Sequence, residues 1–166
     1  MTKIIENLKK HNSRGQSVLF STFKSWRDPV TRSDIFGPVI AYSWTVDEKL
    51  ASLKDPKKNF SLHLLPDASG FICFENPWVP NNYLLLDAYA KERVHLTVPW
   101  QLTKPQNPKS ADPPTFFAPL SDPYINPADG KPGQFGITAW VEYAGRYYFE
   151  LDYHSGQFLW GREIRD

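Results

Sequence analysis

The sequence predicts an α+β fold: a mostly antiparallel sheet of about six or seven strands, with two or three short helices on one face. Short apolar runs recur along the chain and are separated by turn-forming residues, which is typical of hairpin-linked strands. Other stretches carry apolar residues at helical spacing behind a capping residue. The length of 166 residues suits one domain, so we assign 1–166 to a single α+β domain.

Three stretches are predicted to be helical. The first covers 2–12, where apolar residues recur at helical spacing. The second covers 45–55, because Thr45 and Glu48 have the spacing of a capping box and a proline follows. The third covers 83–92, a leucine-rich run behind an asparagine that is suited to an N-cap.

The remaining ordered stretches are predicted to be strands: 17–23, 37–44, the hairpin 59–76, 93–100 and the C-terminal three-stranded meander 136–164. In the hairpin, a five-residue loop over 66–70 places His63 opposite Cys73.

The meander has a register that the apolar pattern favours. A three-residue loop at 143–145 pairs Val141 with Tyr147, and the same register pairs Ile137 with Leu151. A four-residue loop at 153–156 then sets Leu151 beside Phe158 and Phe149 beside Trp160.

Composition and charge exclude several function classes. Nineteen basic and eighteen acidic residues give a net charge of +1, which provides no basic field for nucleic acid. Cys73 is the single cysteine, so neither an internal disulfide nor a multi-cysteine metal site is expected. The N-terminal segment lacks a signal-peptide core, and no apolar run has the length of a membrane span. We expect a cytoplasmic protein that binds neither membrane nor nucleic acid.

Two histidine arrangements are candidates for catalysis. His95 and Thr97 form a His-x-Thr on a predicted strand, which resembles one half of the paired motif of the two-histidine phosphoesterases. The resemblance implies a general base or acid beside a phosphate-binding hydroxyl, and His95 with Thr97 supplies one such pair. His63 opposite Cys73 is the second arrangement, a possible imidazole–thiolate pair. For each, a purely structural role is the simpler interpretation.

Other motifs for chemistry are weak or absent. Carboxylates recur in the meander, where paired acids beside a tryptophan would suit sugar chemistry and an exposed, salt-bridged face is the simpler interpretation: Glu142, Glu150, Asp152 and Glu163. No metal-binding pattern and no glycine-rich phosphate loop is present, so we predict no metal site and no cofactor.

A proline-rich arm over 104–136 interrupts the strands. It holds eight of the fifteen prolines, which oppose regular structure, and yet it is rich in large apolar residues. The arm either plugs the protein's own core or presents stiffened aromatic side chains to a partner. The candidate partner-binding residues are Phe116, Phe117, Leu120 and Tyr124.

The sequence therefore favours a non-enzymatic module that binds another protein, such as a small inhibitor or immunity-type protein. Two alternatives stay open: a hydrolase or phosphoesterase that uses His95 and Thr97 or His63 and Cys73, and a glycan or small-ligand binder that uses exposed tryptophans.

Overall fold

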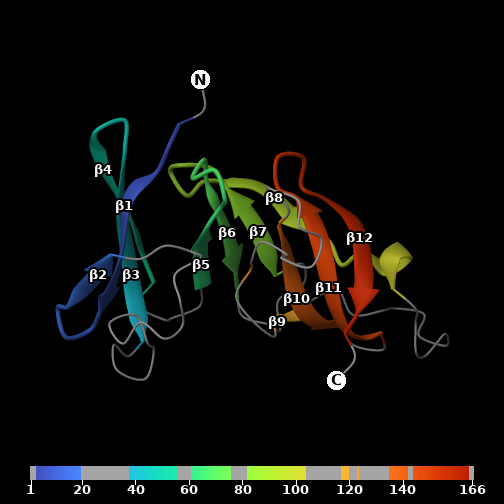
Figure 1. Ribbon diagram of the computed structural model, residues 1–166. Coiled ribbons are helices and arrows are strands. Elements are labelled where there is room, and N and C mark those ends of the chain that lie inside the picture. The colour runs from blue at the N-terminus through green and yellow to red at the C-terminus, as the bar shows by residue number, and fades with distance from the viewer. Residues whose placement is uncertain are drawn as a thin grey trace.

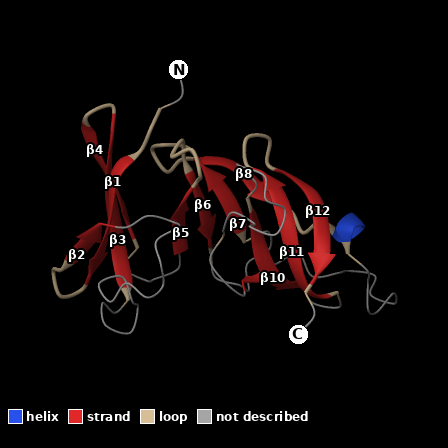
Figure 2. Cartoon of the chain, in the orientation of Figure 1, coloured by secondary structure: helices blue, strands red, loops and turns tan. Residues whose placement is uncertain are grey.

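β-Strands make up most of the described chain. The computed structural model describes residues 3–19, 38–55, 61–75, 82–103, 117–119, 123, 135–141 and 144–164. The strands are β1 (Glu6–Asn12), β2 (Ser17–Leu19), β3 (Val39–Val46), β4 (Lys49–Lys54), β5 (Ser61–Leu64), β6 (Phe71–Phe74), β7 (Tyr83–Leu86), β8 (Glu92–Leu96), β9 (Ala118–Pro119), β10 (Gly136–Val141), β11 (Gly145–Asp152) and β12 (Gln157–Glu163). A single 3₁₀ turn, η1 (Trp100–Leu102), is the one helical element in these ranges, so the predicted α+β class is wrong (Figure 2).

The strands form three antiparallel sheets of four strands each. The first sheet has the order β2-β1-β3-β4, the second β5-β6-β7-β8 and the third β12-β11-β10-β9. The second sheet lies between the other two, as Figure 1 shows. A first core fills the space between the first and second sheets, and a second core fills the space between the second and third sheets. The molecule is therefore a three-layer, all-β arrangement.

The middle position of the second sheet follows from its sequence. β6 reads FICF and β7 reads YLLL, so neighbouring side chains on both faces are apolar. Along β7, Leu84 faces the first core and Leu85 faces the second core. Continuous apolar runs of this length are typical of strands covered on both faces.

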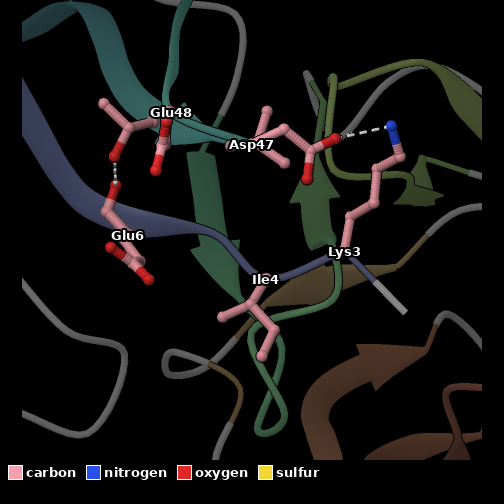
Figure 3. A pocket seen from close by; sticks show the side chains of 7 residues that line it. Lys3, Ile4, Glu6, Asp47 and Glu48 are labelled. Atoms are coloured by element: carbon pink, nitrogen blue, oxygen red, sulfur yellow. Dashed lines mark hydrogen bonds and ion pairs between the residues drawn. The ribbon is translucent and has the colours of Figure 1, made fainter. Parts of the chain in front are cut away.

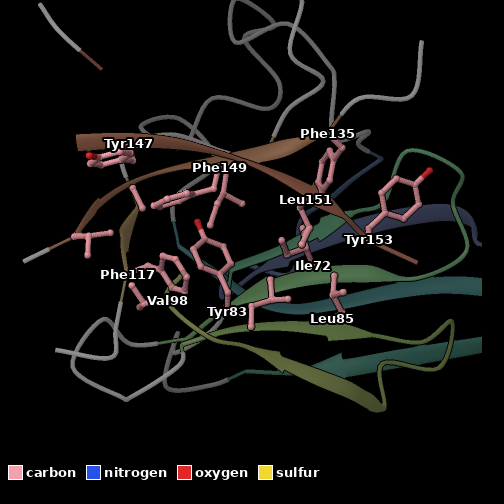
Figure 4. Close-up of a cluster of buried hydrophobic side chains, with 14 of the residues drawn as sticks. Ile72, Tyr83, Leu85, Val98, Phe117, Phe135, Tyr147, Phe149, Leu151 and Tyr153 are labelled. Atoms are coloured by element: carbon pink, nitrogen blue, oxygen red, sulfur yellow. The ribbon is translucent and has the colours of Figure 1, made fainter. Parts of the chain in front are cut away.

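The third sheet, together with the residues that flank its strands, contributes most of the second core. Figure 4 shows Tyr147 and Phe149 of β11 on the same side of the core as Phe135, with Tyr83 of the second sheet facing them. Phe149 stacks on Tyr147 with ring centroids 5.4 Å apart, and Phe117 packs edge-on to Tyr83 at 5.3 Å.

The predicted helix at 2–12 is strand β1. Asn7 has a positive φ of 54°, and the pairing with β3 shifts between Glu6 and Lys9. The bulge adds one residue, so that Ile5 and Leu8 both reach the first core although three positions separate them. A three-residue spacing thus imitated helical periodicity.

The predicted helix at 45–55 is the β3–β4 hairpin. Val46 pairs with Lys49, and the two turn residues Asp47 and Glu48 have φ values of 51° and 63°. Two positive φ values in a two-residue loop define a type I′ turn, which suits the twist of a hairpin. The spacing of Thr45 and Glu48 is therefore not a capping box.

The predicted helix at 83–92 is β7, a tight turn and the start of β8. Asp87 stabilises that turn, because its carboxylate accepts hydrogen bonds from the amides of Tyr89 and Lys91 at 2.8 and 2.9 Å. A short apolar run fits a buried strand or a buried helix equally well, so periodicity alone did not separate the two.

The hairpin over 59–76 forms, with a register one residue away from the predicted one. His63 pairs with Ile72, and Cys73 pairs with Leu62. The loop between β5 and β6 covers six residues, 65–70, because β5 ends at Leu64. The Leu65 amide donates a hydrogen bond to the Gly70 carbonyl across the loop. A one-residue shift changes the face of every side chain, which separates His63 from Cys73.

The meander is confirmed in its strands and its faces, but its first register is wrong by two residues. Val141 pairs with Gly145, and Ile137 pairs with Phe149. Leu151 pairs with Phe158 as predicted, but a bulge then pairs Phe149 with Gly161 in place of Trp160. A shift of two residues keeps each side chain on its face, so the apolar pattern could not detect it.

Candidate functional site

The edge strand β4 is an exposed and regular feature of the first sheet. No described strand lies beside β4 on the side away from β3. Leu50, near the turn, is 77% exposed, the most of any large apolar residue in the described part of the chain. Large apolar side chains in such positions are frequently contacts for another protein.

A hollow of about 170 Å³ lies beside β4, where the first sheet stops short of the edge of the second sheet. Its lining is mostly apolar and carries two carboxylates: Leu53, Cys73, Glu75, Leu84, Leu86, Ala90 and Glu92. An apolar cavity of about 150 Å³ accepts a benzene ring, so this hollow has room for one large apolar side chain.

A second, larger hollow of about 560 Å³ lies where the chain enters β1 beside the β3–β4 turn. Figure 3 shows Glu6 and Glu48 on one side of this hollow and the Lys3–Asp47 pair on the other. Ile4 also lines it and is 57% exposed. The hollow therefore combines apolar surface with carboxylates.

Lys3, Asp47 and Tyr89 join the first and second sheets at this end. Lys3 Nζ lies 2.7 Å from Asp47 Oδ2 and donates to the Tyr89 hydroxyl at 3.1 Å, and that hydroxyl donates to Asp47 at 3.2 Å. The hydrogen bond to Lys3 holds the pKa of the Asp47 carboxyl below its usual range, and the same bond raises the pKa of Lys3. Acid breaks the pair only when the pH falls through that lowered pKa, so it persists at neutral pH.

His95 and Thr97 both lie on exposed surface along β8 and beyond its end. His95 Nδ1 lies 2.6 Å from Glu92 Oε1, three residues earlier. Neither residue lines either of the two hollows. The arrangement holds one imidazole and one carboxylate on open surface.

His63 and Cys73 lie on opposite faces of the second sheet, so the predicted pair does not form. The Ser61 hydroxyl lies 2.8 Å from His63 Nε2, and Cys73 packs in the first core. Burial raises the pKa of the Cys73 thiol to about 12. A thiol with such a pKa is protonated at neutral pH and is a poor nucleophile.

Phe117, the one described residue among the four arm candidates, is fully buried. Its amide donates to Asn82 Oδ1 at 2.6 Å, and its carbonyl accepts from Asn82 Nδ2 at 2.8 Å. In this conformation the Phe117 side chain packs within the second core. Phe116, Leu120 and Tyr124 lie outside the described residues, and their partner contacts stay a prediction.

Glu150 is a buried member of the predicted carboxylate set. It accepts hydrogen bonds from the Phe135 amide at 3.0 Å and from the Tyr148 hydroxyl. These bonds satisfy a buried carboxylate and fix the chain where it enters β10. Glu142 lies outside the described residues.

The tryptophans of the described ranges give little support to the predicted alternative of a glycan-binding groove. Of the four tryptophans in the described ranges, Trp140 is exposed and Trp44 is fully buried, donating to the Ala88 carbonyl at 2.7 Å. The same ranges hold no group of three or more His, Cys, Asp or Glu placed to bind a metal ion. They also contain no helix long and apolar enough to cross a membrane.

Sequence reasoning misses β4 because the spacing of Thr45 and Glu48 predicts a helix over 45–55. The available signal was the Asp47-Glu48 dipeptide between two runs that can pair as strands. It was weak because type I′ turns usually place glycine at the second position.

Comparison with known proteins gives a structural likeness. No family model and no curated protein matches the chain. A chain in the solved structure described as "Structure of Tne2 in complex with Tni2" superposes with a TM-score of 0.64 and 13% sequence identity. The match covers 98% of this chain and 100% of that chain, so the two share a fold over nearly their whole lengths.

Proposed function

We propose that this protein is a non-enzymatic protein-binding module of inhibitor or immunity type, which occludes a partner protein. The observation that carries the proposal is the full-length likeness to a chain found in a complex of two proteins, Tne2 and Tni2. An inhibitor needs a stable scaffold and a surface for its partner. The two cores provide the stable scaffold. We assign the surface for the partner to the exposed end of the first sheet.

The surface around the β3–β4 turn has the composition of a protein contact. Ile4, Leu50 and Tyr89 expose apolar area, while Glu6 and Glu48 add negative charge. Aromatic and large aliphatic side chains supply most of the energy of protein interfaces, and charge complementarity directs the encounter. The partner is expected to present basic residues.

The enzymatic and glycan-binding alternatives rest on less. A general acid–base site needs a second titratable group near the first in a concave site. His95 has Glu92 beside it but lies on open surface, and His63 is separated from Cys73 by the sheet itself.

Partner capture followed by reconstitution tests the proposal. The tagged protein is used to recover a partner from its source cells after crosslinking, and the partner is then produced separately. Titration calorimetry is expected to give a one-to-one complex, with the partner's own activity lost upon binding.

The test variant is Leu50→Arg, which replaces an exposed apolar side chain with a positive charge that repels a basic partner. It should weaken binding by about tenfold or more, corresponding to about 1.4 kcal/mol, at an unchanged melting temperature. The proposal fails if no purified candidate binds the wild-type protein, or if the bound partner keeps its full activity.

A further inference from the structure

We infer that β4 is the binding edge, and that a strand of the partner protein adds to it and extends the first sheet. This inference rests on the proposed function and names its surface. The partner strand is expected to be extended, with an apolar residue that faces the second sheet and a lysine or arginine two places away.

The hairpin geometry fixes which backbone groups of β4 are open. Val46 and Lys49 flank a two-residue turn, so they form a hydrogen-bonded pair, and such pairs alternate along an antiparallel ladder. The hydrogen bond of 2.7 Å from the Asp55 amide to the Ile40 carbonyl continues the same alternation. The N–H and C=O groups of Leu50, Ser52 and Lys54 consequently point away from β3. They are placed to pair with an incoming strand.

The other described edge strands are less suitable for strand addition. β2, β5 and β9 have three, four and two residues, and β9 ends in proline. The pairing of β8 is interrupted by a bulge, and Arg93 ties β8 to the carbonyls of Tyr153 and His154. The pairing of β12 also contains a bulge. β4 pairs over six residues without a shift, and its lysines stand at its two ends. Short strands, prolines, bulges and charged side chains such as lysine protect sheet edges, and the four residues between Lys49 and Lys54 carry none of these features.

The smaller hollow gives the added strand its side-chain specificity. Leu53 is the β4 residue that lines it, and Leu84 and Leu86 of the second sheet lie beneath. A partner residue opposite Leu53 shares its face and therefore points into the hollow. The next residue on that face lies about 7 Å along the strand, within reach of Glu75 or Glu92.

A second copy of this protein does not fit the same edge. Antiparallel pairing of two β4 strands would place both second sheets on the same side of the joined sheet. The second sheet extends beyond β4, since Leu84 and Leu86 line the hollow beside it and the side chains of Glu92 and His95 on β8 are exposed. The two overhanging edges would collide, whereas a single strand fills the space.

Two substitutions at one position separate the backbone contribution from the side chain. Ser52→Pro removes an outward N–H, and proline is tolerated where that group faces solvent. Ser52→Ala keeps the N–H and shortens the side chain. With the reconstituted partner, Ser52→Pro should weaken binding at least about tenfold and Ser52→Ala by less than about twofold, both with melting temperatures near wild type.

Charge reversal and peptides test the side-chain contacts. Glu75→Lys with Glu92→Lys should weaken binding of the partner, most strongly at low salt. Among overlapping 12-residue peptides tiled across the partner, one with an apolar residue two places from a lysine or arginine should compete with the whole partner for wild-type protein.

Each outcome has one meaning. A complex that forms equally well with Ser52→Pro and Ser52→Ala overturns the inference and leaves the proposed function standing. A failure to form any complex overturns the proposed function first. If light scattering finds a dimer of this protein that Ser52→Pro dissociates, the occupant is a second copy, and the inference is wrong.

Discussion

Glu48 occupies the second position of the β3–β4 turn with a φ of 63°, a conformation that costs a residue with a Cβ about 1–2 kcal/mol. Glu48→Gly is therefore expected to raise the free energy of unfolding by up to about 1 kcal/mol, after allowance for the greater freedom of glycine in the unfolded chain. Chemical denaturation measures the change. Lys49→Gly, one residue later in an extended strand, is the control and should be destabilising. Equal losses in both variants would contradict a type I′ turn.

Cys73 is buried at the first core, and its pKa is raised to about 12. At neutral pH the thiol should react with Ellman's reagent only as fast as the protein opens. Sub-denaturing urea should therefore speed the labelling, because it increases the open population. Rapid, stoichiometric labelling of the native protein would show that the thiolate is accessible.

Phe117 and Asn82 test whether Phe117, a residue of the predicted arm 104–136, belongs to the core. Phe117→Ala should cost about 3–5 kcal/mol, as aromatic truncations in a core do. Asn82→Ala leaves the amide and carbonyl of Phe117 without their side-chain partners and should cost about 1–3 kcal/mol for each buried group. An unchanged denaturation midpoint for Phe117→Ala would place this side chain outside the core.

The two faces of β7 provide a test of the layered arrangement. Leu84 and Leu85 are adjacent in sequence but lie in different cores. Leu84→Ala and Leu85→Ala should each cost about 2–5 kcal/mol. In a sheet covered on one face only, one of the two would have little effect on the denaturation midpoint, and that result would contradict a buried middle sheet.

The strands that the sequence predicts best are those whose alternation is uninterrupted. In the meander, the sequence identified the inward face correctly, because a shift of two residues preserves faces. Gly136, opposite Glu150, fits this register because it lacks a side chain: a Cβ there would lie 2.5 Å from the Tyr148 hydroxyl. Such a close approach is invisible in the apolar pattern. The bulge at Asn7 and the two-residue turn at Asp47 were missed for the same reason, since both depend on backbone conformation.

The three-layer architecture was beyond the sequence because a doubly covered strand and a short buried helix have the same composition. A helix over 83–92 removes β7 from the second sheet, so β6 and β8 are left without the strand that joins them. The candidate site is not predicted either, because β4, which lines the hollow, lies in the stretch 45–55 that is predicted to be a helix. The predicted arm, the histidines and the cysteine can be singled out in a sequence because their residue types are chemically distinctive. An open edge strand is recognised by the lack of a neighbouring strand on one side, and residue types do not reveal that feature.

Amide hydrogen exchange of the free protein and of its complex, followed residue by residue, compares the β4 edge with the rest of the surface. In the free protein the amides of Ala51 and Leu53 should already be protected by β3, while those of Leu50, Ser52 and Lys54 exchange freely. In the complex these three should become protected, together with slower exchange in the turn from Asp87 to Glu92 beside the hollow. Protection confined to other surfaces, with Leu50, Ser52 and Lys54 still exchanging at the free rate, would contradict strand addition at β4.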